Sequence, residues 1–590
     1  MKYQLIKPVN EKYSALQQVL TNRGVNIEDI DHYINTTDAD VASYLDLGED
    51  RLKAAAAAIA SCITEGSKAL VVVDSDCDGF TSSALLINYL HDCFPTWVEN
   101  NVDYFMHSGK QHGLSDFPEE AIAFTKLILV PDAGSNDYIY HEDLSSKGID
   151  IVILDHHEAP HISEHAIVIN NQLCDYENKH LSGVGVTWQF CRYLDSLLGK
   201  NFANKYLDLV ALGLTADMMS LLSLETKHLI SQGFTEEYVN NPFIYYMWQK
   251  NQFKLGDKIT SWGAAFYIAP FVNAMVRSGT QEEKELLFES MIVHKAFEMI
   301  PSTKRAHKPG ETEQRVTQAI RTCVNVKNRQ SRAQDAGIEF LKSMIKEQNL
   351  LDNKVLLFLL NPGQIDKNIA GLVANKFMAI YQRPCCILTR VETADAESGL
   401  VEVSYQGSAR GCDKTGVTKF KDICENTGIT LFTAGHQGAF GLGLREQDIE
   451  EFINKTNKAL EDMTEESLYY VDYIYKGNKV NSQNILDIAG MGGYWGKDVD
   501  ESYVAVEDLK VTKNMVFLSE NKTTLKITLP NGIEIIKFGS NEEEYNSFLS
   551  SGYIKVNIVG TCGISRYNGA ITPQIQIENY EITERAKYFL

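Results

Sequence analysis

The chain has 590 residues, of which 78 are acidic and 55 are Lys or Arg, so its formal net charge is −23. This balance excludes a uniformly basic surface, and any polyanion must therefore meet a local basic channel. The chain is 44% hydrophobic and 23% charged, and these globular proportions exclude a disordered scaffold. The length predicts about three or four domains.

The N-terminus and the cysteines indicate the cellular compartment in which the protein works. No apolar run follows the first lysines, and no stretch approaches the roughly 18 apolar residues of a membrane-spanning helix. The 11 cysteines are an odd number and show no C-x-x-C spacing, which fits neither a disulfide framework nor a cysteine-based zinc site. We therefore expect a cytoplasmic protein without membrane attachment.

Short apolar runs alternate with helix-like stretches from residue 70 to about residue 230. This pattern is typical of a parallel sheet that is buried on both faces. The runs at 69–73, 127–130 and 151–154 are the expected strands, and each stops at an aspartate or one residue before one. The sequence thus predicts an α/β domain.

Residues 300–346 are polar and helical in pattern, and Pro301 and Pro309 interrupt the start of this region. The segment carries ten basic and four acidic side chains, against the sign of the whole chain. Two interpretations stay open here: a solvated helix that links two domains, or a helix that follows phosphates.

A second α/β block begins at residues 354–360 and runs to about residue 459. Beyond it, residues 524–529, 553–558 and 574–578 alternate with period two, as half-buried antiparallel strands do. The C-terminal part is therefore predicted to be a small β-domain.

Acidic and histidine side chains follow the expected strands. In an open parallel sheet, ligands bind beyond the carboxyl ends of the strands, so these side chains should converge. Taken singly, an aspartate in such a place is usually a helix cap or turn residue, and a histidine pair can be structural. The candidates are Asp74, Asp76 and Asp78 in DSDCDG, Asp132, Asp155, His156, His157, and Asp217 after the apolar stretch 208–216.

Several carboxylates at one sheet edge would repel one another unless cations compensate them. Oxygen ligands with one histidine and no thiolate suit Mn²⁺ or Mg²⁺, and this many carboxylates can serve two ions. A two-metal centre indicates phosphoryl chemistry. A calcium-binding loop is excluded because Leu85 occupies the position of its bidentate Glu. Residues 491–498 nearly match a phosphate-binding loop, but Met491 and Asp498 do not fit that motif.

The ordered motifs resemble those of the DHH phosphoesterases and, within them, the RecJ single-strand-specific exonucleases. The matching segments are DSDCDG at 74–79, DAG at 132–134, DHH at 155–157 and GLTAD at 213–217. Later segments are similar to further motifs of that family: IAPFVNA at 268–274 with Arg277, GLVA at 371–374, GSAR at 407–410 and AGHQGA at 434–439.

The resemblance covers nearly the whole chain and implies its architecture. It implies a parallel-sheet DHH domain joined by a long helix to a second α/β domain, the DHH-associated domain, and then a β-barrel with an OB-like fold. The expected parts are an N-terminal helical segment (1–60), the catalytic domain (61–299), the connecting helix (300–350), the substrate-binding domain (351–460) and the nucleic-acid-binding domain (461–590).

The resemblance also implies roles for individual residues. Asp74, Asp76, Asp78, Asp132, His156 and Asp217 would hold two Mn²⁺ or Mg²⁺ ions, with Asp132 as the bridge and Asp74 as a ligand or the support of one. Asp155 would fix His156, and His157 would orient the reacting phosphate. The expected substrate-binding residues are Asn273, Arg277, Lys376, Ser408, Arg410, Gly435 and His436.

Two departures from the family pattern stand out. His107 occupies the place of an arginine, which puts one phosphate contact in question. Residues 492–497 do not match the segment that the family usually has near the C-terminal domain, which indicates that DNA is bound in a different way.

The implied function is metal-dependent 5′-to-3′ hydrolysis of single-stranded DNA to 5′-mononucleotides, in recombination and repair. We expect a monomer that works with a helicase and a single-strand-binding protein. Two alternatives stay open: a phosphodiesterase for oligonucleotides or cyclic dinucleotides, and a catalytically inactive replication scaffold. The polarity rests on the resemblance alone.

Overall fold

The computed structural model describes residues 1–109, 111–115, 122–394, 401–463, 468–567 and 570–586. The chain divides into two compact units. The parallel-sheet unit consists of Arg23–Lys327 and Gly490–Glu501. The two-sheet unit consists of Met1–Asn22, Asn328–Ala489 and Ser502–Leu590.

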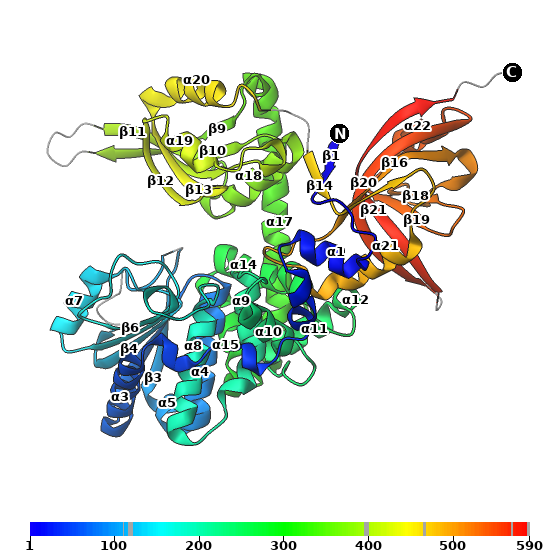
Figure 1. Ribbon diagram of the computed structural model, residues 1–590. Coiled ribbons are helices and arrows are strands. Elements are labelled where there is room, and N and C mark those ends of the chain that lie inside the picture. Colours follow the sequence, from blue (N-terminus) through cyan, green and yellow to red (C-terminus); the bar gives the residue numbers. More distant parts are fainter. Residues whose placement is uncertain (110, 116–121, 395–400, 464–467, 568–569, 587–590) are drawn as a thin grey trace. The chain divides into compact units, whose positions relative to one another are not determined.

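A five-stranded parallel sheet is the centre of the first unit (Figure 1). The strand order is β3-β2-β4-β5-β6. After β2, the chain therefore places β3 on one side of β2 and β4 on the other side. The expected α/β domain is confirmed. The strands are β2 (Lys68–Val73), β3 (Val102–Met106), β4 (Thr125–Pro131), β5 (Asp150–Asp155) and β6 (Ile167–Asn170).

Helices cover both faces of this sheet, which explains why the strands are apolar throughout. On one face α4 (Cys77–Cys93) packs against β2, and α8 (Gly183–Leu198) packs against β5. On the other face Leu144 of α7 (Tyr138–Ser146) joins a core with residues of β2, β4 and β5. Both faces of the strands are therefore buried.

Further helices of this unit surround α4 and α8. The apolar stretch 208–216 is part of a helix, α9, which packs on α4 and α8. The helices are α2 (Ile30–Ile34), α3 (Glu49–Glu65), α5 (Pro95–Asn101), α9 (Leu207–Ala216), α10 (Leu224–Gly233), α11 (Pro242–Lys250), α12 (Gln252–Leu255), α13 (Ser261–Tyr267), α14 (Ala269–Ser278), α15 (Gln281–Met291) and α16 (Val293–Ala296).

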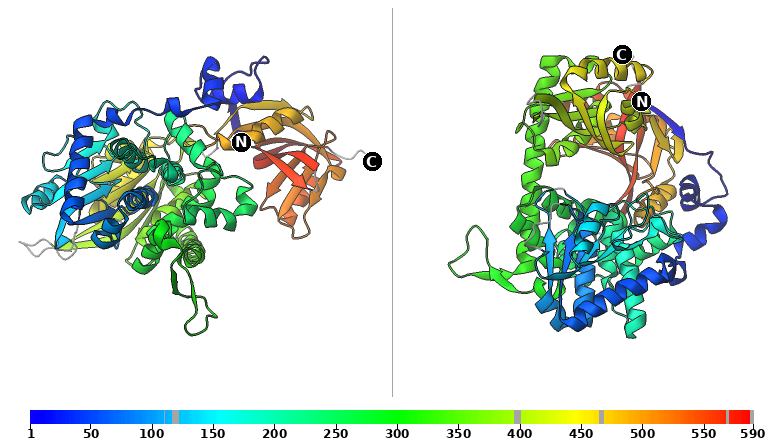
Figure 2. Two further views of the ribbon diagram at one scale, coloured as in Figure 1. Left: turned by 90° about the horizontal axis from the view of Figure 1, so that it is seen from below. Right: turned by 90° about the vertical axis from the view of Figure 1, so that its left-hand side faces the viewer.

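The helix α17 (Arg315–Gln348) is 34 residues long. The sequence predicted helical character from residue 300, but residues 299–314 form a hairpin of β7 (Met299–Pro301) and β8 (Thr312–Gln314). Pro301 and Pro309 fall in this hairpin, which agrees with their poor fit to a helix interior. The hairpin projects from the helices of its unit (Figure 2).

The two-sheet unit contains a mixed sheet of order β12-β13-β11-β10-β9. Only β9 and β10 of this sheet are parallel, and α18 (Lys367–Tyr381) packs on β10 and β11. The strands are β9 (Leu356–Leu360), β10 (Cys385–Ala394), β11 (Val401–Arg410), β12 (Thr430–His436) and β13 (Ala439–Arg445), with helices α19 (Phe420–Glu425) and α20 (Ile449–Ala459).

The second sheet of this unit has seven strands in the order β15-β16-β20-β21-β19-β18-β17. The period-two segments at 524–529, 553–558 and 574–578 lie on three of these strands, as the alternation predicted. The strands are β15 (Tyr473–Lys476), β16 (Tyr503–Thr512), β17 (Val516–Leu518), β18 (Thr524–Thr528), β19 (Glu534–Phe538), β20 (Tyr553–Tyr567) and β21 (Ala570–Arg585), with helices α21 (Ser482–Ala489) and α22 (Glu542–Leu549).

The N-terminus differs from the expected helical segment. Residues of β1 (Lys2–Leu5) form a strand parallel to β14 (Leu468–Val471), followed by α1 (Ala15–Asn22). Tyr3 and Leu5 pack against Tyr469 and Val471, so a short alternating segment gains apolar contacts as a strand. Among the residues described, no helix is long and apolar enough to cross a membrane.

Gly213 tests the packing of α9 on α4. A Cβ at this position would lie 2.5 Å from Thr81 Oγ1 and 2.6 Å from Val184 Cγ1. We expect Gly213→Ala to lower the free energy of unfolding by about 1–3 kcal/mol, because an overpacked core must shift. Gly492→Ala is the control, since no atom lies within 4 Å of its added Cβ. Equal melting temperatures for the two variants would contradict this account.

Candidate active site

The predicted acidic residues meet at the carboxyl edge of the parallel sheet, where the strand order reverses between β2 and β4. Asp74 follows β2, Asp132 follows β4, and Asp155 ends β5. Asp76 caps α4 by accepting a hydrogen bond from the Gly79 amide at 2.9 Å. Asp217 arrives from the end of helix α9 and not from a strand.

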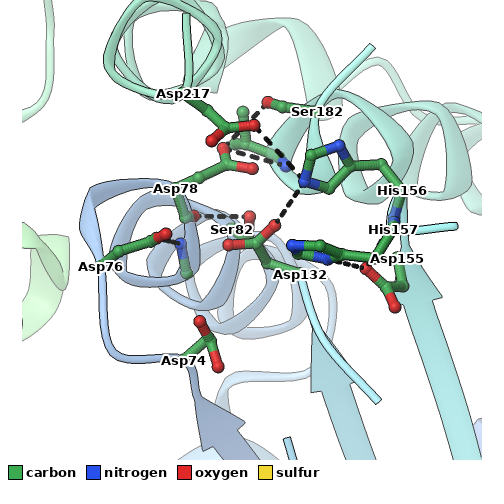
Figure 3. A network of polar contacts seen from close by, with 12 residues as sticks. Asp74, Asp76, Asp78, Ser82, Asp132, Asp155, His156, His157, Ser182 and Asp217 are labelled. Carbon is green, nitrogen blue, oxygen red and sulfur yellow. Dashed lines mark hydrogen bonds and ion pairs between the residues drawn. The ribbon is translucent and has the colours of Figure 1, made fainter. Parts of the chain in front are cut away.

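The histidine His156 links the carboxylates of different elements (Figure 3). Its Nε2 lies 3.3 Å from Asp132 Oδ1 and 3.4 Å from Asp217 Oδ2. Three sets of side chains bring their ligand atoms within 4.8 Å of one another: Asp78, His156 and Asp217; Asp74, Asp76 and Asp132; and Asp132, Asp155, His156 and His157. The structure thus brings together all the residues predicted to hold metal.

Burial makes these carboxylates hard to ionise. It raises the pKa of Asp132 well above its usual range, and the charges of Asp78, Asp76 and Asp74 raise it further. The pKa of Asp217 rises to about 8, by burial and then by the charges of Asp78 and Asp76. Without a cation, this edge of the sheet therefore cannot hold all of its carboxyl groups in the ionised form at low cost.

The donor atoms fit divalent cations. Asp78 Oδ2 and Asp132 Oδ1 are buried, and neither atom has a hydrogen-bond partner in the described part of the chain. Burial also lowers the pKa of His156, which favours the neutral imidazole that a metal ligand requires. Carboxylate oxygens with imidazole nitrogen are ligands that suit Mn²⁺ or Mg²⁺, and the number of carboxylates is sufficient for two ions.

Asp155 positions the two histidines. Its Oδ1 accepts hydrogen bonds from the backbone amides of His156 and His157 at 2.7 and 3.1 Å. The same oxygen lies 2.8 Å from His157 Nδ1, and Oδ2 accepts a hydrogen bond from the Ser135 amide at 3.0 Å. The hydrogen bond that the His157 ring donates to Asp155 raises the pKa of His157 to about 9, which favours the cationic imidazole.

A close approach of backbone helps to hold Asp132. Asp132 has φ +69°, in the left-handed region, and its amide donates a hydrogen bond to the Leu154 carbonyl at 2.8 Å. Gly183 at the start of α8 lies against it, because a Cβ there would come within 2.6 Å of Asp132 Cα. Only glycine at position 183 allows α8 to pack this near to the carboxylate.

The structure adds one residue that the sequence analysis did not select. His112 Nδ1 lies 2.7 Å from Asp74 Oδ2, and the Gly113 amide donates a hydrogen bond to Asp74 Oδ1 at 3.2 Å. The only signal in the sequence that could have indicated His112 was its place soon after His107, the residue that differs from the family pattern. His107 is buried, and its Nε2 lies 2.9 Å from the Gly113 carbonyl oxygen, so it holds this turn.

Asn273 and Arg277 lie on α14, which packs on α4 and α9 of the same unit. Partial burial lowers the pKa of the Arg277 guanidinium, and the charge of Asp76 opposes this change. Arg277 therefore lies within electrostatic reach of the acidic cluster.

In the two-sheet unit, strand register gathers Ser408, Arg410 and His436 at one end of the mixed sheet. Arg410 and His436 both pair with Ala439, and Ser408 lies two residues from Arg410 on the same face. Gly371 of α18 leaves room for them, because a Cβ there would lie 3.2 Å from Arg410 Cζ and 3.3 Å from Ser408 Oγ.

Gly435 and Lys376 are the other expected substrate residues of this unit. Gly435 has φ +125°, and a Cβ there would lie 2.9 Å from the Ala439 carbonyl oxygen, so its place in β12 requires glycine. Lys376 Nζ lies 3.2 Å from Asp335 Oδ1 of α17, and this ion pair gives it a structural contact.

Comparison with known proteins agrees with these features. The model of the DHH family, N-terminal domain, matches residues 68–214, and the model of the RecJ OB domain matches residues 471–579. The chain is 34% identical to YorK of Bacillus subtilis (strain 168), a prophage-derived protein named as a single-strand DNA-specific exonuclease, over 99% of this chain and 98% of YorK.

Two RecJ proteins are also similar. The single-stranded-DNA-specific exonuclease RecJ of Bacillus subtilis (strain 168) is 24% identical over 99% of this chain and 71% of RecJ. Crystal structures of RecJ from Thermus thermophilus give TM-scores of 0.69 with Mn²⁺ and 0.64 with Mg²⁺. They are 17% and 16% identical in sequence and cover 99% and 100% of this chain and 80% and 79% of RecJ. The chain therefore belongs to the DHH family, in the group that contains YorK and RecJ, as the motifs predicted.

Asp132→Asn tests the metal centre without an assay of activity. We expect the variant to melt at a higher temperature than the native protein in chelator at neutral pH, because the Asp132 carboxyl, with its raised pKa, must take up a proton on folding and an amide need not. Mn²⁺ at about a hundred times its dissociation constant would stabilise the native protein by about 2.7 kcal/mol, and the variant would lose most of this gain.

Asp103→Asn is the matched control for this measurement, since its side chain on β3 is 73% exposed. It should keep the full response to Mn²⁺. Equal stabilisation of Asp132→Asn and the native protein by Mn²⁺ would contradict a metal site at Asp132.

Proposed function

We propose that the chain is a metal-dependent exonuclease that degrades single-stranded DNA from its 5′ end to 5′-mononucleotides, in recombination and repair. The observation that carries this proposal is the convergence of Asp78, Asp132, His156 and Asp217, in which a buried oxygen of Asp78 and one of Asp132 accept no hydrogen bond within the described part of the chain. YorK and RecJ, which share its family, are named for action on single-stranded DNA.

The acidic cluster would hold the two ions through Asp74, Asp76, Asp78, Asp132, His156 and Asp217, with Asp132 between them. When bound, the ions would supply positive charge at the phosphate oxygens and activate the attacking water. The protein's part is to hold the ligand atoms before the substrate arrives, which Asp155 does for His156 through the backbone.

His157 is suited to a reacting phosphate. Asp155 occupies its Nδ1, and its side chain is 55% exposed, so Nε2 is left to donate a hydrogen bond. Since the pKa of His157 is raised to about 9, this donor carries a positive charge at neutral pH. A charged donor strengthens the hydrogen bond to a phosphate oxygen as negative charge develops on it.

Phosphate contacts of the strand are proposed for Arg277, Ser408 and Arg410. The guanidinium fork of an arginine matches two phosphate oxygens. His436, which lies across β13 from Arg410 in the same register, would contact the strand near its end. A helicase and a single-strand-binding protein as partners, and a monomeric state, are proposed on the family resemblance alone. A reducing cytoplasm suits the 11 free cysteines.

End-labelled single-stranded DNA tests the activity and its direction. With Mn²⁺ or Mg²⁺, a 5′ label should be released early as mononucleotide, while a 3′ label should stay on a shortening strand. Chelator and Asp132→Asn should each abolish release, whereas Asp103→Asn should cut at the native rate. Release from the 3′ label first would contradict the polarity.

Two other outcomes would replace the proposal. Strand binding without cleavage in either metal would favour an inactive scaffold. Cleavage confined to short oligonucleotides or cyclic dinucleotides would favour the smaller phosphodiesterases.

Arg410→Lys tests recognition of the terminal phosphate. A lysine keeps the charge but loses the bidentate geometry, so we expect KM for 5′-phosphorylated strands to rise about tenfold with little change in kcat. KM for strands with a 5′-hydroxyl should change much less. The control is Arg445→Lys, because Arg445 is paired with Glu402 at 2.7 Å on the neighbouring strand β13. An equal rise in KM for both kinds of end would contradict this role.

A further inference from the structure

Three aromatic rings are exposed on the helices α12 and α13 of the parallel-sheet unit. Phe253 on α12 is fully exposed, and Phe266 on α13 is 58% exposed. Trp262 lies one helical turn before Phe266 and is partly exposed, with ring centroids 4.7 Å apart. We call Phe253, Trp262 and Phe266 the aromatic platform. Rings of this size are normally buried, so their exposure requires an explanation.

The scaffold under the aromatic platform is well held. The buried Trp248 of α11 donates a hydrogen bond from Nε1 to the Gly256 carbonyl at 3.1 Å, which fixes the end of α12. Asn251 Nδ2 donates to the Tyr267 carbonyl at 3.2 Å, which ties α12 to the end of α13. Thr260 caps α13 by accepting a hydrogen bond from the Gly263 amide at 3.0 Å. The rings are therefore presented on an ordered surface, with little ordering left for a ligand to induce.

Three lysines lie on the same segment of the chain as the aromatic platform. Lys250, Lys254 and Lys258 are exposed, and Lys254 Nζ lies 4.9 Å from the centre of the Tyr267 ring. None of the three has a carboxylate within ion-pair distance in the described part of the chain. Residues 249–267 contain these three lysines and one acidic residue, Asp257, so the segment is basic in a chain of charge −23.

We propose that the aromatic platform binds single-stranded DNA by stacking bases on its rings, with Lys250, Lys254 and Lys258 at the phosphates. Stacking on aromatic side chains beside basic groups is how proteins bind single strands without regard to sequence. A protein partner fits less well, because lysine is depleted in the cores of protein interfaces. This inference rests on the proposed function, since it names a second contact for the same strand.

The platform has a structural path to the proposed phosphate contacts. Ile268 alone separates the end of α13 from the start of α14, the helix that carries Asn273 and Arg277, and the two helices pack together. Bases held on α13 would therefore lie next to the helix that carries Arg277. The platform would keep a long strand bound while its terminal nucleotide is removed.

Tryptophan fluorescence offers a direct test. The chain has five tryptophans, and Trp97, Trp188, Trp248 and Trp495 are each no more than 8% exposed. Trp262 is thus the tryptophan that a base can reach. We expect oligodeoxythymidine, added to the full-length protein in chelator at low salt, to quench the fluorescence in a saturable way. Trp262→Phe should remove the quenching but keep most of the affinity, because the ring still stacks.

Loss of the rings should weaken binding. We expect Trp262→Leu and Phe266→Leu each to weaken affinity for a long strand about tenfold, as measured by anisotropy of a labelled oligonucleotide. Lys254→Gln should make the salt dependence shallower by about one released counterion. Phe297→Leu is the control, since Phe297 is 47% exposed in the same unit but lies outside the platform.

Cleavage separates this inference from the proposed function. For a long strand, Trp262→Leu should raise KM and leave kcat unchanged. A dinucleotide is too short to reach both the aromatic platform and the acidic cluster, so the variant should cut it at the same rate as the native protein does. Cleavage by the native protein without quenching would overturn the platform and leave the exonuclease standing. Quenching without any cleavage would leave the platform standing and overturn the exonuclease.

Discussion

The burial of several carboxylates at one sheet edge is the constraint on which the rest of the structure depends. Asp78 and Asp132 each keep a buried oxygen without a hydrogen-bond partner in the described part of the chain, and burial together with neighbouring charge raises the pKa of Asp132. Such a cluster costs folding free energy in the absence of cations. The sheet and the helices α4 and α8 must therefore be stable enough to hold these side chains in place. The strands of the sheet are apolar on both faces because helices cover both faces.

Two histidines that are neighbours in the sequence have different functions. His156 is buried and has a lowered pKa, so it offers a neutral nitrogen to a metal. His157 is exposed, and the hydrogen bond that it donates to Asp155 raises its pKa to about 9. Burial produces the first state and Asp155 the second, because Asp155 fixes both backbone amides but contacts only the ring of His157. Neighbouring residues of the same type can thus serve as ligand and as cationic donor.

The sequence predicted the parallel sheet, the β-domain and the convergence of the acidic residues, because apolar runs and the aspartates after them are local signals. It missed His112, whose place beside Asp74 depends on the contact between His107 and the Gly113 carbonyl oxygen. It also placed residues 300–314 in a helical region and residues 2–5 in a helical segment. Residues 299–314 form the hairpin of β7 and β8, and residues 2–5 form β1, whose partner β14 is more than 450 residues away, which no local pattern can indicate.

The acidic character of the chain bears on how a strand could stay bound while it is shortened. A net charge of −23 disfavours long-range attraction of DNA, so affinity must come from short-range contacts. Stacking on exposed rings such as Trp262 and Phe266 is short-range and tolerates any base, whereas contacts from three lysines alone would weaken quickly with salt. A strand that spans both the rings and the acidic cluster is held at several points, but a released mononucleotide is held at one. This difference would favour departure of the product while the strand remains.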